Sequence, residues 1–467
     1  MGLGLHGGGL AAALYLHRRG ARVTVTDLRT TGELAPTLRK LPESIRVVAG
    51  EHREKDFLEA DLVLKNPAVP RTAPLLKLAP AVTTDIALFL AEWTGRLGGD
   101  RGPLVAVTGT KGKSSTAAAT AAILGSERGG TRLGGNITIS PLGFLEELQG
   151  GDPVVLELSS FQLGDLRFCR EINRPGNDAL PEEVLFPRLN ADVAIVTSIF
   201  PDHQDYYDSI DSYVRDKEEI LRHLRPGALA ILGCTEGWKG RFAAAAAAGA
   251  AGVTVREPED EEIGDLLPPT PAMAGTHMRR NLFFAALAAR HLGVPPDQVR
   301  AAAGSFTGVA HRLERIGERE GLEIVNDTAA TIPEATLAAA EAYTNPLVLI
   351  AGGSDKGLDS GVLVRAGRVV LQGGGAIILL EGSATDLLVP LFREAGIPLH
   401  GPERSLRASF ARAVQLAREI RAGEAAETVT ILLSPGCASF GMFRNEFDRG
   451  DQFRALAEAF LATGAAP

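Results

Sequence analysis

The sequence predicts an α/β protein of two to four domains with mostly parallel sheets. Three observations lead to this prediction. The chain has 467 residues, which is too long for a single hydrophobic core. Short apolar segments alternate with longer helical segments, a pattern typical of parallel strands joined by crossover helices. Two glycine-rich turns each lead into a helix, as at the phosphate-binding edge of such sheets.

The composition is that of an ordinary globular protein. Hydrophobic residues make up 45% of the chain, charged residues 22%, and the formal net charge is -9. A negative charge argues against nucleic acid as a partner, and no apolar run is long enough to cross a membrane. We see no signal peptide, and the three widely spaced cysteines fit a reducing compartment. We therefore expect a cytoplasmic protein without a nucleic-acid or membrane partner. We also expect a monomer that acts on small molecules, although the composition does not show this.

The chain opens with a turn that favours nucleotide binding. Three glycines follow G-x-G-x-x-G spacing before a helix predicted over 10–19: Gly2, Gly4 and Gly7. A strand predicted over 22–26 ends at Asp27, where dinucleotide-binding folds place a carboxylate on a ribose. A tight turn without a ligand explains the motif about equally well. The strand that should precede the glycines is absent, so either the assigned start lies inside a longer gene or the sheet lacks that strand.

The strongest signal lies at residues 105–117, VAVTGTKGKSSTA. An apolar strand is followed by two glycines that permit a tight loop, and an alanine-rich helix follows. Backbone N–H groups of such a loop and the positive end of its helix bind phosphate. We therefore expect Gly109, Thr110 and Gly112 to hold a nucleoside triphosphate. Val107 stands where the general P-loop pattern has its first glycine.

The residues after this loop supply a cation and metal ligands. Lys113 places a charge near the terminal phosphates, and the hydroxyl of Ser114 or Ser115 can ligate Mg²⁺. A buried strand predicted from Pro153 ends in Glu157. A carboxylate at the carboxyl end of a parallel strand lies beside the P-loop, so we favour a Mg²⁺ ligand over a solvated strand end.

Further polar side chains follow in the second half of this block. Asp202 and His203 come after a strand predicted over 193–197, although a lone histidine is more often structural than functional. Lys217 stands among acidic neighbours on a predicted helix, which by itself favours a solvated, ion-paired face. Asn281, near the start of another helix, could contact a base, cap or pack. We predict a loop at 170–188.

The last third contains another α/β block, which begins near Thr307. Strands are predicted over 322–325, 346–350, 376–380 and 428–433, and most end in small, polar or glycine-rich loops. This pattern is typical of a doubly wound sheet with one binding edge. Cys437 in the last loop has no evident partner histidine, so a packed thiol is favoured over a nucleophile. We place three domains at 1–98, 99–306 and 307–467.

Together these motifs resemble the Mur ligase family over nearly the whole chain. The matching segments, in order, are GLGLxG at 2–7, TDIxLF at 84–89, GTxGKS at 109–114, GNI at 135–137, ELSSFQL at 157–163, DH at 202–203, HR at 311–312, ND at 326–327 and LLSPxCAS at 432–439. The resemblance implies an N-terminal Rossmann-like domain for a uridine nucleotide. A central P-loop ATPase-type domain for ATP and a C-terminal Rossmann-like domain for an amino acid are implied to follow it.

The family likeness also implies an activity. The implied activity is that of an ATP-dependent ligase of peptidoglycan synthesis, which adds glutamate to UDP-N-acetylmuramoyl-L-alanine through an acyl phosphate. In the matching members the amino acid is D-glutamate. The implied catalytic residues are Lys113, His203 and Lys217. Lys217 matches a carbamylated lysine, which overturns the reading as a solvated face. The implied Mg²⁺ ligands are Ser114, Ser115, Glu157, His203 and the Lys217 carbamate.

The remaining implied site residues bind the nucleotide or the substrates. ATP would contact the P-loop residues named above and also Asn281, Arg312 and Asp327. The substrate residues on the UDP-sugar side are Leu5, His6, Asp27, Arg29 and Asn136, with Ser159 beside them. Those of the amino-acid pocket are Thr331, Lys356, Ser439 and Phe440.

Several positions depart from the family pattern and keep alternatives open. Ala329 replaces a family lysine, Met278 a common asparagine, Ala87 a usual glutamate and His6 a hydroxyl residue. The same chemistry with L-glutamate or another amino acid is therefore an alternative, and a folate-like acceptor is a weaker one. An NAD-dependent oxidoreductase would explain the first glycine turn but not the P-loop or Glu157. A P-loop binding or regulatory protein without ligase activity is the remaining alternative.

Overall fold

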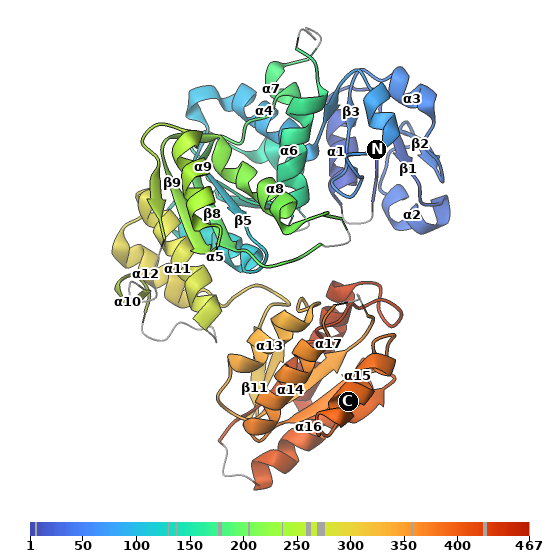
Figure 1. The fold of residues 1–467 in the computed structure, drawn as a ribbon, viewed down its shortest axis with the longest axis vertical. Coiled ribbons are helices and arrows are strands. Elements are labelled where there is room, and N and C mark those ends of the chain that lie inside the picture. The colour runs from blue at the N-terminus through green and yellow to red at the C-terminus, as the bar shows by residue number, and fades with distance from the viewer. Residues whose placement is uncertain are drawn as a thin grey trace. The chain divides into compact units, whose positions relative to one another are not determined.

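The computed structural model describes residues 1–4, 7–128, 130–136, 139–175, 180–203, 206–235, 237–257, 263–268, 276–355, 358–423 and 427–466. The predictions made at Leu5, His6 and Lys356 lie outside these residues. The chain forms two compact units, Met1–Pro269 with Arg280–Gly304 and Thr270–Arg279 with Ser305–Pro467 (Figure 1). Most of residues 1–306 belong to the first unit, and the three predicted domains with their boundaries stay a prediction.

Short parallel strands and helices form the N-terminal part of the first unit. Strand β1 (Thr24–Asp27) pairs with β2 (Arg46–Ala49), and β3 (Val63–Leu64) pairs with β4 (Val82–Thr83). The helices are α1 (Gly8–Arg18), α2 (Thr31–Leu38), α3 (Glu54–Leu58) and α4 (Asp85–Leu97), with 3-10 turns at Pro74–Leu78 and Gly98–Asp100. This alternation of strand and helix agrees with the Rossmann-like fold expected here.

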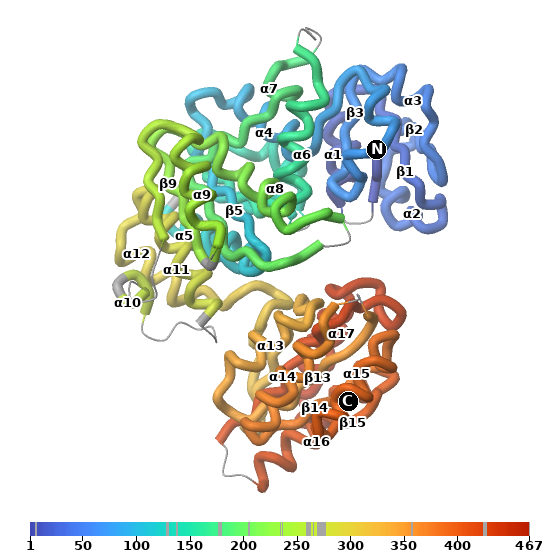
Figure 2. The backbone as a smooth tube through the Cα atoms, viewed as in Figure 1, coloured from blue at the N-terminus to red at the C-terminus, as the bar shows by residue number. Residues whose placement is uncertain are grey.

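The first two residues lie between β1 and β3. The Met1 ammonium donates to the carbonyl of Leu64 at 2.9 Å, and the Gly2 N–H donates to the carbonyl of Thr26 at 2.8 Å. Met1 and Gly2 thus bridge β1 and β3, and Figure 2 shows the N-terminus beside both strands. A Cβ at Gly9 would lie 2.3 Å from the carbonyl oxygen of Leu3, so α1 packs directly on this segment.

The central block is built on a parallel sheet. Among the described residues its six strands lie in the order β10-β9-β8-β5-β7-β6, and every pairing is parallel. Their bounds are β5 (Leu104–Thr108), β6 (Arg132–Gly135), β7 (Val154–Glu157), β8 (Ala191–Ser198), β9 (Leu224–Cys234) and β10 (Thr254–Arg256). Because the chain leaves β5 toward one edge and later crosses to the other, the carboxyl end of β5 is the switch point where such sheets bind ligands.

Helices cover both faces of this sheet (Figure 1). They are α5 (Lys113–Arg128), α6 (Ser160–Ile172), α7 (Glu182–Leu185), α8 (Ile210–Arg222), α9 (Lys239–Gly249), α10 (Ile263–Leu266), α11 (Thr276–His291) and α12 (Pro296–Ser305), with 3-10 turns at Pro141–Gly143 and Leu145–Glu147. Leu104 and Ala106 of β5 join one core cluster together with Phe89 and Trp93 of α4. Helix α4, which we assigned to the first domain, therefore packs into the core of the central block.

The prediction of a loop at 170–188 was wrong at two places, whereas the other described residues of this segment are irregular. Helix α6 continues to Ile172, and α7 forms from Glu182 to Leu185. Buried Leu185 and Val184 stabilise α7, and the Val184 carbonyl accepts a hydrogen bond from Thr83 Oγ1 at 2.9 Å. Proline content suggested a loop, but burial of this apolar pair favours the helix.

The second unit contains a mixed six-stranded sheet in its described part, with the order β11-β12-β16-β13-β14-β15. Only the pairing of β11 with β12 is antiparallel among those observed. The strands are β11 (Glu314–Arg319), β12 (Leu322–Asn326), β13 (Leu347–Gly352), β14 (Ala376–Leu380), β15 (His400–Glu403) and β16 (Val429–Leu433). The helices are α13 (Pro333–Glu341), α14 (Gly361–Gln372), α15 (Thr385–Glu394), α16 (Leu406–Gly423) and α17 (Glu446–Thr463).

The core of the second unit explains its doubly wound form. Val348 and Ile350 of β13 pack into a cluster with residues of α16 and α17, whereas Leu347 and Leu349 pack into a second cluster with residues of α13, α14 and α15. Successive residues of a strand point to opposite faces, so both faces of this sheet are covered by helices. The α/β fold class predicted from the sequence is confirmed.

Candidate active site

The P-loop lies at the carboxyl end of β5, at the switch point of the central sheet. Gly109 has a φ of 146° and Gly112 a φ of 83°, a region that favours glycine. A Cβ at Gly109 would lie 2.0 Å from Thr197 Oγ1, so the loop also touches β8 too closely for a side chain. The two glycines are required by backbone conformation and by close packing together.

Contacts with the end of β8 fasten the loop. The Thr110 N–H donates to the Ser198 carbonyl at 2.7 Å, and the Lys111 N–H donates to Ser198 Oγ at 3.0 Å. Thr110 Oγ1 also accepts a hydrogen bond from the Phe200 N–H at 3.0 Å. These bonds hold the loop in one conformation without any ligand, as a preorganised binding loop requires.

Lys113 and the two serines start helix α5 beside the loop. The Lys113 ammonium donates to the carbonyls of Gly109 and Thr110, both at 3.0 Å. The Ser114 and Ser115 side chains are buried. The cation and the hydroxyls predicted to meet a triphosphate and its metal therefore lie together.

Asn281 reaches the same loop from α11. A Cβ at Gly112 would lie 2.4 Å from Asn281 Oδ1, so the amide lies directly against the loop backbone. The sequence offered three roles for Asn281, and its place beside the P-loop fits the nucleotide contact.

Glu157 has an oxygen that fits a metal ion. Its side chain is 1% exposed at the end of β7, next to β5. Oε1 accepts a hydrogen bond from Asn136 Nδ2 at 3.1 Å. Oε2 is buried and has no hydrogen-bond partner among the described residues, which is costly unless another group completes the site. Carboxylate and hydroxyl oxygens are the ligands that Mg²⁺ prefers, so Glu157 with Ser114 and Ser115 would suit this ion.

Protein carboxylates, imidazoles and thiols do not form a complete metal cage here. Within the described part of the chain, no group of three His, Cys, Asp or Glu side chains is arranged to hold a metal.

Lys217 is buried and lies against the P-loop, so a solvated face is wrong for it. Its side chain is 2% exposed, and Nζ donates to the Gly109 carbonyl at 2.7 Å. Burial, with the nearby charge of Lys113, lowers the pKa of Lys217 well below its usual value, against the weaker opposite effects of Asp202, Asp216 and Glu157. A lowered pKa favours the neutral amine, which is the form that can react with CO₂ to give a carbamate.

Tyr213 is a member of this site that the sequence analysis missed. Its ring lies against the Lys217 side chain, with Nζ 4.7 Å from the ring centroid, and its hydroxyl lies 2.9 Å from Thr110 Oγ1. Tyr213 and Lys217 are four residues apart on α8, so they share one face of the helix. This spacing was the available signal, but a single tyrosine is too common to stand out.

His203 and Ser159 were also predicted to belong to this site, and the structure gives each a different place. The His203 side chain is 44% exposed and its ring centroid lies 6.4 Å from that of Tyr213, so it borders the site. Ser159 caps helix α6 and shares a capping box with Gln162, which is a structural role. Whether His203 and Ser159 contact ligands stays a prediction.

Asp27 and the first glycine turn form a separate site in the N-terminal part. Asp27 is buried at the end of β1, where Oδ2 accepts from the Gly4 N–H at 3.0 Å and Oδ1 from the Arg29 N–H at 2.9 Å. The carboxylate thus ties Gly4 to the backbone of Arg29. The exposed Arg29 guanidinium lies 3.7 Å from Asp27 Oδ1.

Asp327 is the most perturbed predicted residue of the second unit. Burial raises the pKa of its carboxyl to about 7, although Ser434, the Leu313 N–H and the charge of Arg312 oppose the rise. Oδ2 accepts from Ser434 Oγ at 2.7 Å, and Oδ1 accepts from the Leu313 N–H at 3.1 Å. Asp327 thereby joins the ends of β12 and β16.

The other predicted residues of this unit lie around the same strand ends. Ser439 is buried, whereas the Phe440 side chain is 66% exposed, and Thr331 follows a turn after β12. Buried Arg449 was missed: it donates to Thr328 Oγ1 at 2.9 Å and to the Thr328 carbonyl at 3.0 Å. Arg449 lies in the first turn of α17, and an arginine at such a position carries no sequence signal of burial.

Comparisons with known proteins agree with this geometry. Residues 107–262 match the model of the Mur ligase middle domain, and residues 1–87 match that of the Mur ligase MurD-like N-terminal domain. The UDP-N-acetylmuramoylalanine–D-glutamate ligase of Roseiflexus sp. is 40% identical over 98% of this chain and 98% of its own. The protein of that name from Treponema pallidum is 36% identical over 97% and 96%.

Solved structures share the fold at low identity. MurC of Thermotoga maritima, a UDP-N-acetylmuramate-alanine ligase, is 17% identical with a TM-score of 0.54 and covers 98% of both chains. Folylpolyglutamate synthase of Mycobacterium tuberculosis, solved with ADP and AMPPCP, is 15% identical with a TM-score of 0.54, over 80% of this chain and 95% of that one. Fold and P-loop site together define a nucleotide-dependent α/β enzyme. With the full-length relatives beside them, the particular group is clear: the chain belongs to the Mur ligase family.

Proposed function

We propose that this protein is an ATP-dependent ligase that joins D-glutamate to UDP-N-acetylmuramoyl-L-alanine in peptidoglycan synthesis. Its relatives with 33–40% identity over nearly the full length carry the name of this activity. The observation that carries the proposal is the meeting of Lys113, Glu157 and Lys217 at the P-loop. An oxidoreductase has no use for this arrangement.

The chemistry has two steps. A carboxylate oxygen of the acceptor attacks the γ-phosphorus of ATP, the bond to the β-phosphate oxygen breaks, and an acyl phosphate and ADP form. The amine of the incoming amino acid then attacks the acyl carbon, loses a proton, and phosphate leaves with the C–O bond electrons. Charge develops on the transferred phosphoryl group in the first step, which is where the P-loop N–H groups and the Lys113 ammonium act.

Glu157, Ser114, Ser115, His203 and a Lys217 carbamate would hold Mg²⁺. When bound, the ion supplies positive charge that lowers the barrier to phosphoryl transfer. The buried, unpartnered Glu157 Oε2 and the lowered pKa of Lys217 support this assignment. Asn281, Arg312 and Asp327 are proposed to contact ATP, Asp27, Arg29 and Asn136 the UDP-sugar, and Thr331, Ser439 and Phe440 the amino acid.

No helix in the described parts combines the length and apolar character needed to cross a membrane. We propose that the enzyme takes only small-molecule substrates from solution and works as a monomer in the cytoplasm.

A phosphate-release assay tests the proposed function. We expect release only when ATP, Mg²⁺, UDP-N-acetylmuramoyl-L-alanine and D-glutamate are present together. If phosphate release is faster with L-glutamate than with D-glutamate, the substrate is L-glutamate and the proposed ligase chemistry still holds. ATP hydrolysis that is indifferent to both acceptors would reject the ligase.

Lys217→Ala tests the carbamate within the same assay. We expect this variant to release no phosphate. Added short carboxylates such as formate should restore part of its phosphate release. An unaffected variant would reject the role of this lysine.

A further inference from the structure

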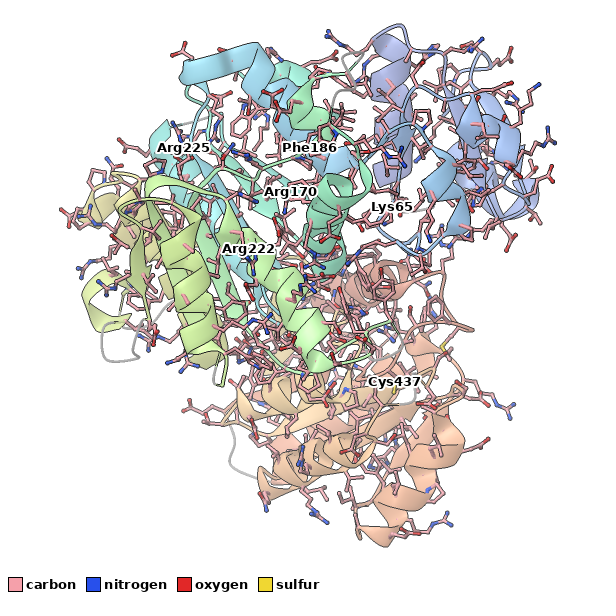
Figure 3. The ribbon with its side chains drawn as sticks, turned by 45° about the horizontal axis from the view of Figure 1, so that its top comes forward. Lys65, Arg170, Phe186, Arg222, Arg225 and Cys437 are labelled. Atoms are coloured by element: carbon pink, nitrogen blue, oxygen red, sulfur yellow. The ribbon has the colours of Figure 1, made fainter. Side chains whose placement is uncertain are left out.

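A buried cluster of charged side chains joins the N-terminal part of the first unit to helix α6. Lys65 and Asp165 have 0% and 1% of their side chains exposed, and Lys65 Nζ donates to Asp165 Oδ2 at 2.6 Å. Figure 3 labels Lys65 beside the N-terminal part of the ribbon. Arg71 Nε donates to the other oxygen of Asp165 at 3.1 Å. Asp165 therefore receives two cations from the N-terminal part.

Arg71 continues past α6 to a second carboxylate, Asp216 on α8. Its two terminal nitrogens donate to the two oxygens of Asp216, the Nη1 bond being 3.3 Å long. Asp216 also accepts from Arg167 Nη2 at 2.7 Å and from the Tyr207 hydroxyl at 2.9 Å. Its side chain is 1% exposed. A bidentate arginine–carboxylate pair fixes the orientation of the carboxylate and also favours its charged form.

A glycine opens the path that the guanidinium takes. A Cβ at Gly164 of α6 would lie 2.2 Å from Arg71 Nη2 and 2.3 Å from Asp216 Oδ2. Glycine inside a helix is less favourable than alanine by about 0.5–1 kcal/mol, so an interior glycine needs a reason. Here the missing side chain allows Arg71 to pass over α6 and reach α8.

Asp216 directly precedes Lys217, whose Nζ contacts the P-loop carbonyl of Gly109. Adjacent residues of a helix point about 100° apart, since a turn takes 3.6 residues. Fixing Asp216 from the side of α6 therefore fixes the rotation of α8 about its axis, and with it the direction of Lys217.

We infer that Arg71 is a positioning residue which couples the N-terminal part of the protein to Lys217 through Asp216. The inference rests on the proposed function for the role of Lys217, and it goes further because neither end of the Arg71–Asp216 pair belongs to the proposed site. In this arrangement, the part proposed to bind the uridine nucleotide sets the geometry of the lysine that serves the triphosphate.

Arg71→Met removes the guanidinium and keeps much of the side-chain length. We expect the Lys217 carbamate signal, read by ¹³C NMR with labelled bicarbonate, and kcat both to fall about 10- to 100-fold, the usual effect of losing a group that orients a metal ligand. KM for the UDP substrate should change little. Hydrogen exchange should quicken in α8.

Lys65→Met is the matched control. It removes the other buried cation on Asp165 but leaves the Arg71–Asp216 pair in place. We expect a lower melting temperature with carbamate signal, kcat and α8 exchange near those of the wild type. The inference is overturned if the two variants lose stability alike and both keep the carbamate signal and the protection of α8 amides against hydrogen exchange. The cluster would then only stabilise the fold.

Two further variants decide the matter should Arg71→Met fail to fold. Gly164→Ala keeps every charge but places a methyl in the path of Arg71, and it should reproduce the loss of carbamate and of α8 protection. Arg71→Lys keeps one donor and should recover part of both. Wild-type protein without ligase activity would reject the proposed function alone, because α8 exchange in these variants reports on the coupling independently.

Discussion

Gly112→Ala probes the P-loop with the smallest possible change. At a φ of 83°, an alanine costs about 1–2 kcal/mol more than glycine. Its methyl would also lie 2.4 Å from Asn281 Oδ1 and 3.0 Å from Cγ, so the amide and the loop N–H groups must move apart. Loss of one hydrogen bond to a charged phosphate costs about 1.5–3 kcal/mol. We therefore expect ATP to bind about 10- to 100-fold more weakly.

Titration calorimetry with ATP and Mg²⁺ measures this loss, and thermal unfolding measures the backbone strain. Gly125→Ala in α5 is the control, because its Cβ would meet nothing closer than 3.9 Å. Replacing a glycine inside a helix by alanine stabilises by about 0.5–1 kcal/mol, so this variant should melt higher and bind ATP unchanged. The reasoning is refuted if Gly112→Ala binds ATP as tightly as the wild type.

Two other predictions follow from buried carboxylates. Glu157→Gln should raise the Mg²⁺ concentration needed for phosphate release, while the unliganded protein becomes no less stable, since Oε2 has no hydrogen-bond partner among described residues; a clear drop in melting temperature would contradict this. With a pKa of about 7 for Asp327, well above its unfolded value, the native state holds the extra proton, so stability should fall as pH rises from about 4 through 7. In urea titrations at several pH values, Asp327→Asn should make the free energy of unfolding depend less on pH. An unchanged pH dependence would count against the raised pKa of Asp327.

Local patterns were sufficient for the fold class and the P-loop. Gly109, Gly112 and Lys113 are neighbours in the chain, so their spacing alone describes the loop that they form. The same holds for the strands predicted from short apolar runs, because such a run is a local property of the sequence. The loop predicted at 170–188 failed because the helix α7 depends on burial of Val184 and Leu185, which no local signal reveals.

The amino-acid sequence alone determined several of the strands, where the phosphate loop lies, and which family the motifs resemble. Only the tertiary structure decided that Lys217 is buried against Gly109, that Tyr213 lies beneath it, and that Arg71 reaches Asp216 past Gly164. These contacts join residues that are up to 145 positions apart. Burial and charge pairing depend on the packing of whole elements. The charge pattern along one helix therefore suggests a solvated face where the folded protein has a buried lysine.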